Sequence, residues 1–108
     1  MATGLLGQAA PNAAAYTTLY VVPATTFTVL SLSLCNRGST TVSVRVALAT
    51  SATPAANGSE FIEYNAEIGA NGVLERTGIM MSANKLLVIY ASNANVSASA
   101  FGIETSTL

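Results

Sequence analysis

The chain has 108 residues, a length that favours a single domain, and a net charge of −1, which gives it no general attraction to nucleic acid or to an acidic membrane. It contains no His, so catalysis by Ser–His or Cys–His pairs is excluded, and its one cysteine, Cys35, cannot form an internal disulfide. Only 8% of the residues are charged, although about a quarter is usual for a soluble domain.

The low charge bears on how the surface meets other molecules. A surface of Ser, Thr, Ala and Asn requires few charges to be desolvated when it is buried against a neighbour. We therefore expect an assembly subunit, with a small β-domain of neutral surface as the alternative. The first residues (MATGLL) lack a basic region and an apolar core, and no apolar run approaches the roughly 20 residues of a membrane span, so secretion and membrane insertion are not expected.

Residues 1–15 (MATGLLGQAAPNAAA) predict an N-terminal arm rather than a strand. Two glycines, Pro11 and an alanine run show no alternation of apolar and polar residues. Leu5 and Leu6 are apolar anchors by which such an arm could lie on a neighbouring subunit, and a mobile terminus is the alternative. We expect the arm to dock on a neighbour, so that its deletion reduces incorporation into an assembly.

Residues 16–108 predict a β-sandwich domain of seven or eight short strands. Alternation is clearest in residues 26–50, where Leu30, Leu32 and Leu34 and then Val42, Val44 and Val46 alternate with other residues. We interpret this stretch as a hairpin about a turn at residues 36–39. Further strands are predicted at residues 16–22, 60–68, 73–80, 85–92 and 96–104.

Several details of these strands stay open. The strand at residues 60–68 has no clean apolar face, so it is an edge strand or carries a bulge, and Gly78 divides residues 73–80 into two short strands around a bend. Residues 85–92 are almost continuously apolar, which indicates a central strand covered on both faces or a strand whose outer face meets a neighbour. The fold class is therefore all-β: a single antiparallel β-sandwich, with the jelly roll among its forms, and an extended N-terminal arm.

The turns are the expected contact sites. Arg37 lies in the turn at residues 36–39, and residues 51–59 (SATPAANGS) form a loop that contains Pro54 and Asn57. We place both turns at the ends of the sandwich and outside its core. With the arm, the candidate interaction residues are Leu5, Leu6, Pro11, Arg37, Pro54 and Asn57.

No residue pattern points to catalysis, a cofactor or a metal. The segment Ser82–Lys85 matches S-x-x-K, but it spans a turn where that chemistry needs a helix, and its companion segments are missing. The chain lacks Asp and has neither a CxxC pair nor an EF-hand loop. Its glutamates, Glu63 among them, are expected to be solvated or salt-bridged. We therefore expect a non-enzymatic protein without a cofactor.

Several segments, in order, resemble a family of small virion structural proteins of tailed bacteriophages, common among phages of aquatic bacteria. The matching segments are residues 5–7 with 10–11, 18–24 (TLYVVPA), 35–39 (CNRGS), 61–64 (FIEY), 70–79 (ANGVLERTGI) and 88–92 with 96–97. The resemblance implies a non-enzymatic β-sandwich that occupies a phage particle in many copies.

The resemblance does not distinguish the capsid from the tail. Together with the low charge, the neutral arm and the lack of a catalytic pattern, it leads us to expect a capsid decoration, or cement, protein. Its partners would be the major capsid protein or other virion structural proteins, and it would form a closed homo-oligomer, for which a trimer is the first expectation. It would be located in the virion, assembled in the host cytoplasm. A tail or baseplate subunit is one alternative. A carbohydrate- or host-surface-binding module is another, weakened by the absence of Trp.

Overall fold

The computed structural model describes residues 2–55 and 58–108, and in these ranges the chain forms eight strands and no helix, so no helical segment there could cross a membrane. The strands are β1 (Thr3–Ala9), β2 (Ala15–Val21), β3 (Thr26–Asn36), β4 (Val42–Ala49), β5 (Phe61–Ile68), β6 (Val73–Met81), β7 (Leu86–Ala91) and β8 (Val96–Ser106). The predicted all-β class is confirmed.

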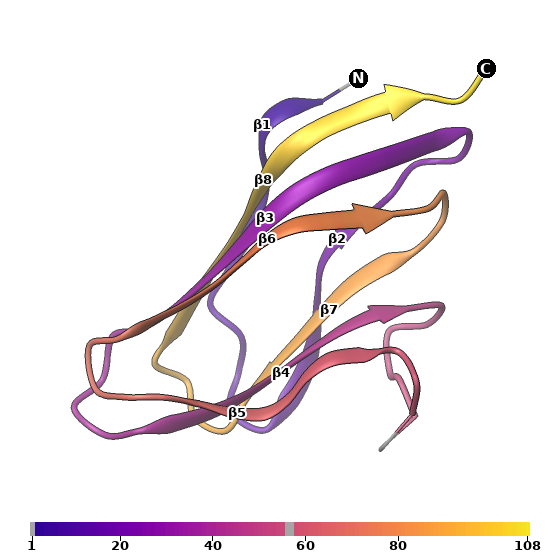
Figure 1. The fold of residues 1–108 in the computed structure, drawn as a ribbon. Coiled ribbons are helices and arrows are strands. Elements are labelled where there is room, and N and C mark those ends of the chain that lie inside the picture. Colours follow the sequence, from indigo (N-terminus) through magenta and orange to yellow (C-terminus); the bar gives the residue numbers. More distant parts are fainter. Residues whose placement is uncertain (1, 56–57) are drawn as a thin grey trace.

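Two antiparallel four-stranded sheets form the sandwich. Their strand orders are β1-β8-β3-β6 and β2-β7-β4-β5, and Figure 1 shows them as two layers, with β8, β3 and β6 above β7, β4 and β5. Most consecutive strands alternate between the sheets, and both ends of the chain lie at the same end of the first sheet (Figure 1). Eight strands connected in this way form a jelly roll, which is the form of sandwich this chain adopts.

The core lies between the two sheets and is built from the residues that alternation selects. Leu30, Leu32 and Leu34 of β3 are buried, and Val42, Val44 and Val46 of β4 are fully buried. Their neighbours in sequence point to the outer faces and are half-buried or exposed, except Ala47, which is buried on the outer face of β4. Strand β7 is buried on both faces through Leu87, Val88 and Ile89, as its continuous apolar run predicts.

The predicted hairpin over residues 26–50 is wrong, because β3 and β4 lie in different sheets. Strand β3 pairs with β6 and β8, whereas β4 pairs with β5 and β7. Alternation indicates which side chains of a strand are buried. It does not indicate which strand lies beside it, because the same face is buried with either neighbour. The segment between the two strands is therefore a corner that leads from one sheet to the other.

Asn36 holds this corner together. Its side chain is fully buried, and its Nδ2 donates to the carbonyl oxygens of Thr40, Ile68 and Gly69 at 2.8, 3.0 and 3.1 Å. Its Oδ1 accepts a hydrogen bond from the Gly38 amide at 2.9 Å. One amide group thus forms hydrogen bonds to backbone groups of two separate turns. Its own oxygen and nitrogen both have partners, as a buried polar side chain requires.

The N-terminal segment differs from the predicted arm. Residues 3–9 form β1, an edge strand that pairs with β8 from Thr3 opposite Ile103 to Ala9 opposite Ala98. A register shift follows Leu5, and Gly7 lies where an added Cβ would meet the Leu19 carbonyl oxygen of β2. Glycines that permit a bulge and a close approach remove the alternation by which a strand is recognised, which explains the wrong prediction.

Strands β5 and β6 resolve the alternatives left by the sequence. Strand β5 is the edge of its sheet and also carries register shifts against β4. Strand β6 is one continuous strand from Val73 to Met81, and Gly78 adopts a φ of 69° at a bulge. The glycine therefore bends β6 without dividing it, in contrast to the predicted pair of short strands.

Candidate interaction surfaces

Five exposed apolar side chains form a continuous patch on the outer face of the β1-β8-β3-β6 sheet. This outer patch consists of Leu5, Val29, Met80, Phe101 and Ile103, whose exposed fractions lie between 40% and 67%. Leu5 is opposite Phe101, and Val29 is opposite both Ile103 and Met80, so the patch crosses all four strands. Residues directly opposite each other in an antiparallel pair share a face, which makes the patch one surface.

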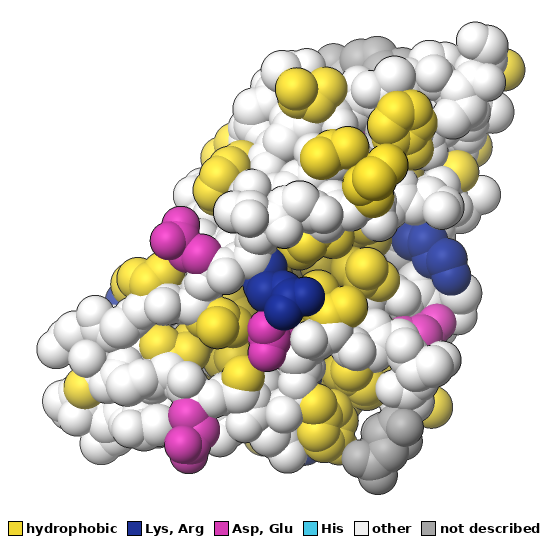
Figure 2. All heavy atoms as spheres, in the orientation of Figure 1, with side chains coloured by type: hydrophobic (Ala, Val, Ile, Leu, Met, Phe, Trp, Pro, Cys, Tyr) yellow, Lys and Arg dark blue, Asp and Glu magenta, His cyan; other side chains and the backbone are white. Residues whose placement is uncertain are grey.

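The border of the outer patch is uncharged, and apart from half-buried Phe27 of β3 it is polar. Thr3, Ser31 and Thr105 occupy the neighbouring positions on the same face. In the space-filling view, hydrophobic side chains gather over the layer of β8, β3 and β6, and no charged side chain interrupts them there (Figure 2). Large exposed apolar patches are uncommon on soluble monomers and mark interaction sites.

An aromatic cluster covers the outer face of the β2-β7-β4-β5 sheet. It is formed by Tyr16, Phe61, Tyr64 and Tyr90. Their ring centres lie 4.9 to 6.3 Å apart in the three contacting pairs, distances typical of aromatic packing. Ala47, Ala49 and Val88 are buried against Tyr16, Phe61 and Leu86 on this face. The two faces of the sandwich thus differ: one is already covered and the other is not.

Arg45 of β4 lies within the aromatic cluster. Its guanidinium carbon is 4.5 Å from the ring centre of Tyr64 and 4.4 Å from that of Tyr90. Its Nε donates to Asn65 Oδ1 at 2.7 Å, and its Nη1 donates to the Tyr16 hydroxyl at 3.0 Å. The Tyr16 hydrogen bond raises the pKa of Arg45 above its ordinary value, so the group stays charged.

The six residues singled out by the sequence do not form one site. Leu5 and Arg37 are exposed, and Arg37 Nη2 donates to the Ala94 carbonyl at 3.1 Å. Leu6 packs against the core, and Pro11 and Pro54 are buried, so these three offer little contact surface. Asn57 lies outside the described residues.

The two predicted contact turns do lie at the sandwich ends. The Arg37 corner precedes β4 and the loop at residues 51–59 follows it, so the two occupy opposite ends of that strand. The prediction that the loop stays out of the core is wrong for Pro54, which is buried. A proline ring is apolar and has no N–H group that burial would leave unpaired, so it can fold inward at little cost.

Sequence reasoning missed four of the five patch residues, although a signal was present. In residues 96–104 (VSASAFGIE), the outward positions change from Ser97 and Ser99 to Phe101 and Ile103. When the outward positions of one strand change from polar to apolar, the apolar positions are expected to be covered by another element or by a partner. Joining these positions to Val29 and Met80 requires the sheet order.

A buried tyrosine links the two sheets at the same end as the outer patch. The Tyr20 hydroxyl of β2 lies 2.8 Å from Thr28 Oγ1 of β3, and it donates to Glu104 Oε2 of β8 at 2.5 Å. The other Glu104 oxygen accepts the Ala2 amide at 2.9 Å. Burial and the carboxylate raise the pKa of Tyr20 to about 12, and the Tyr20 and Ala2 hydrogen bonds lower the pKa of Glu104.

We expect Glu104→Gln to lower stability in a pH-dependent way. A lowered carboxyl pKa stabilises the folded state above the ordinary value of 4.5 and ceases to do so as pH falls through the folded pKa. A raised tyrosine pKa stabilises below the ordinary value of 10.0, and that contribution disappears as pH rises toward 12. In urea unfolding, the gap between wild type and variant should be widest near neutral pH and narrow on both sides. A constant gap would contradict this assignment.

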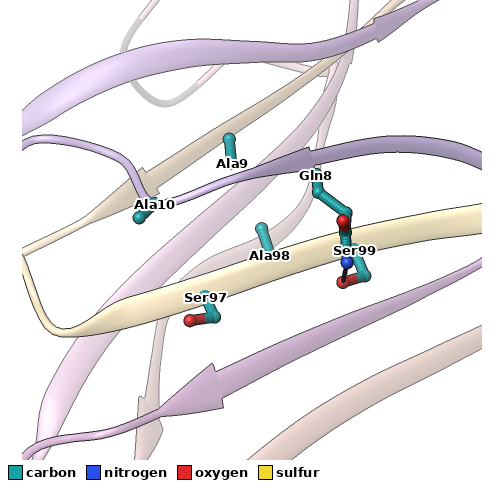
Figure 3. A pocket seen from close by; sticks show the side chains of 6 residues that line it. All are labelled: Gln8, Ala9, Ala10, Ser97, Ala98 and Ser99. Atoms are coloured by element: carbon teal, nitrogen blue, oxygen red, sulfur yellow. Dashed lines mark hydrogen bonds between the residues drawn. The ribbon is translucent and has the colours of Figure 1, made fainter.

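Two further polar features of the structure are a salt bridge between the sheets and a hollow beside β1 and β8. Glu63 of β5 accepts from Arg76 of β6 at 2.9 Å, a salt bridge between the sheets. A hollow of about 340 Å³ is lined by methyl, hydroxyl and amide groups, with Gln8 Nε2 donating to Ser99 Oγ at 3.3 Å (Figure 3). Within the described ranges, no three His, Cys, Asp or Glu residues lie close enough to hold a metal ion.

Comparisons of the chain with protein-family models, with curated proteins and with solved structures find no match. The resemblance to phage virion proteins therefore depends on the sequence segments given above and stays a prediction.

Proposed function

We propose that this protein is a non-enzymatic structural subunit of a phage particle, acting as a capsid decoration protein that binds the outer capsid in many copies. The observation that carries the proposal is the outer patch, an uncharged apolar surface left open on one face of the sandwich. The sequence resemblance is the reason for placing the protein on a phage particle, and the outer patch is the physical reason for expecting it to assemble.

The size of the outer patch suits a repeated contact. Full burial of one large apolar side chain contributes about 1.5 to 3 kcal/mol, whereas association of two proteins costs on the order of 4 to 15 kcal/mol. Five side chains that are already half-buried can offset that cost by only a modest margin. A weak contact between copies is sufficient when the joined copies also bind one capsid surface together, because the binding free energies of many copies add up.

The occupant that we assign to the outer patch is a second copy of this chain. Neither the patch nor its border of Thr3, Ser31 and Thr105 carries a charge, so two copies can meet without desolvating a charged group. A closed homo-oligomer follows, with a trimer as the first expectation from the resemblance. The self-covered aromatic face then stays available for the capsid.

The aromatic cluster gives less support to the alternative of a carbohydrate-binding module. Sugars stack on open aromatic faces, but the Arg45 guanidinium already lies over the rings of Tyr64 and Tyr90. Tyr16 and Phe61 are half-buried and contact other rings or Ala47 and Val88. A tail or baseplate subunit would use the outer patch equally well, and locating the bound protein on particles separates that alternative from the capsid role.

We expect Ile103→Ser and Met80→Ser to convert an oligomer into monomers. Sedimentation equilibrium should give the wild type two or three times the 11.0 kDa of one chain and both variants 11.0 kDa. Val21→Ser is the matched control, because Val21 is 49% exposed but lies in the other sheet. A wild type that is monomeric up to high concentration, or a control that dissociates equally, would contradict the proposal.

A further inference from the structure

The aromatic face holds its arginine in one position using neutral partners. Arg45 is fixed at Nε by Asn65, at Nη1 by Tyr16, and on its faces by the rings of Tyr64 and Tyr90. An arginine side chain loses rotamer entropy when it is immobilised. Here that loss has occurred within the folded chain, so a ligand of Arg45 would not have to supply it.

The backbone of β5 is shaped around this arginine. Opposite Arg45, where a regular ladder would place one residue, β5 contributes two, Tyr64 and Asn65. Asn65 has a φ of 55°, a left-handed conformation that is unusual within a strand. The bulge directs both a ring and an amide oxygen to the same guanidinium, and bulges of this kind commonly re-aim side chains at binding sites.

The positive charge of Arg45 has no negative partner in the described part of the chain. Arg76 is paired with Glu63, but no carboxylate there lies within ion-pair distance of Arg45. The hydrogen bonds of Arg45 involve Nε and Nη1, so within residues 2–55 and 58–108 the two N–H groups of Nη2 have no acceptor. A fixed cation with unused donors is half of a charge-assisted hydrogen-bonded pair.

We propose that Arg45, with the tyrosines around it, is a binding site for a single carboxylate, presented by a Glu or Asp side chain of a partner protein. One cation balances the single charge of a carboxylate, whereas a phosphate would bring up to two negative charges to it. Arginine and tyrosine are also, with tryptophan, the residues enriched among those that dominate binding at protein interfaces.

The carboxylate chemistry follows from the site alone, whereas its location on a protein rests on the proposed function. The site lies on the face opposite to the outer patch, so the two can be tested separately. If the protein stays monomeric but binds a carboxylate at Arg45, the carboxylate site is supported and the proposed assembly role is contradicted. If the protein forms oligomers but binds no carboxylate, the assembly role is supported and the carboxylate site is contradicted.

The test is an NMR titration that follows the Nε–H signals of the arginines in ¹⁵N-labelled protein. The probes are an acetylated, amidated Gly-Glu-Gly peptide and the same peptide with Gln in place of Glu. We expect the Arg45 signal to shift and saturate with the Glu peptide and to stay in place with the Gln peptide. Arg37, an exposed arginine bonded to a backbone carbonyl, is the internal control and should show no saturation.

Two variants show whether the geometry, rather than the charge alone, forms the site. Arg45→Lys keeps the charge but lacks the planar fork, and Asn65→Gly keeps the left-handed backbone but removes the Nε partner. Observed through the backbone amides of β4, each should bind the Glu peptide at least tenfold more weakly while the rest of the amide spectrum keeps its folded pattern. Equal shifts with both peptides, equal saturation at Arg37, or tighter binding of inorganic phosphate would overturn the proposal.

Discussion

Val44→Asp is expected to unfold the protein or to lower its free energy of unfolding by about 4 kcal/mol or more. Val44 lies in the middle of β4 and is fully buried between the two sheets. A carboxylate at this position loses its hydration and gains no cation, because the surrounding core is apolar. Since a domain of this size is stable by only about 5 to 15 kcal/mol, the loss is a large part of the total.

Urea unfolding followed by circular dichroism measures this effect, and the adjacent residue provides the control. Ser43 points to the opposite face of β4 and is half-exposed. Ser43→Asp introduces the same charge into the same strand, so it should cost less than about 1 kcal/mol. Equal losses in the two variants would mean that strand propensity, and not burial of charge, determines the result. An unchanged midpoint for Val44→Asp would reverse the assignment of the two faces.

Asn36→Ala is expected to lower the free energy of unfolding by about 3 kcal/mol, a large effect for the loss of one polar side chain. The substitution removes the donor to three carbonyl oxygens, of which that of Ile68 is buried, and the acceptor of the Gly38 amide. Each buried polar group left without a partner costs on the order of 1 to 3 kcal/mol, although water can enter the vacated space and recover part of it.

The control for Asn36 is Asn12→Ala, at an exposed position between β1 and β2. Thermal unfolding should place this control close to the wild type and Asn36→Ala well below it. Hydrogen exchange adds a local measure, because the corner between β3 and β4 should exchange faster in Asn36→Ala than the middle of β7. Uniform acceleration across all strands would show that the side chain does not act through this corner.

The sequence predicted the strands after β1, and the buried faces of those with clear alternation, because these properties are local. Alternation in residues 26–50 identified Leu30, Leu32 and Val44 as core residues, and each is buried. The pairing of strands is not local. The corner at Asn36 resembles a hairpin turn in composition. The pairing of β3 and β4 in different sheets, and the Asn36 bonds to the distant carbonyls of Ile68 and Gly69, show that it connects two sheets.

The candidate surfaces were harder to predict, because each gathers residues from distant strands. The outer patch takes its side chains from all four strands of one sheet, and its first strand, β1, has glycines in place of alternation. Arg45 is marked by no motif, since its partners Tyr16, Asn65 and Tyr90 come from three other strands. Low overall charge pointed to an assembly surface without locating it, and of the five patch residues only Leu5 was among the predicted contacts.

The most direct test of the assembly role is to add the purified protein to phage particles assembled without it and to locate it by electron microscopy. We predict that the wild type covers the capsid in a regular lattice and raises the capsid melting temperature, and that Ile103→Ser does neither. Attachment to the tail alone would assign the protein to a tail or baseplate position. No attachment to either, or equal decoration by Ile103→Ser, would contradict assembly through the outer patch.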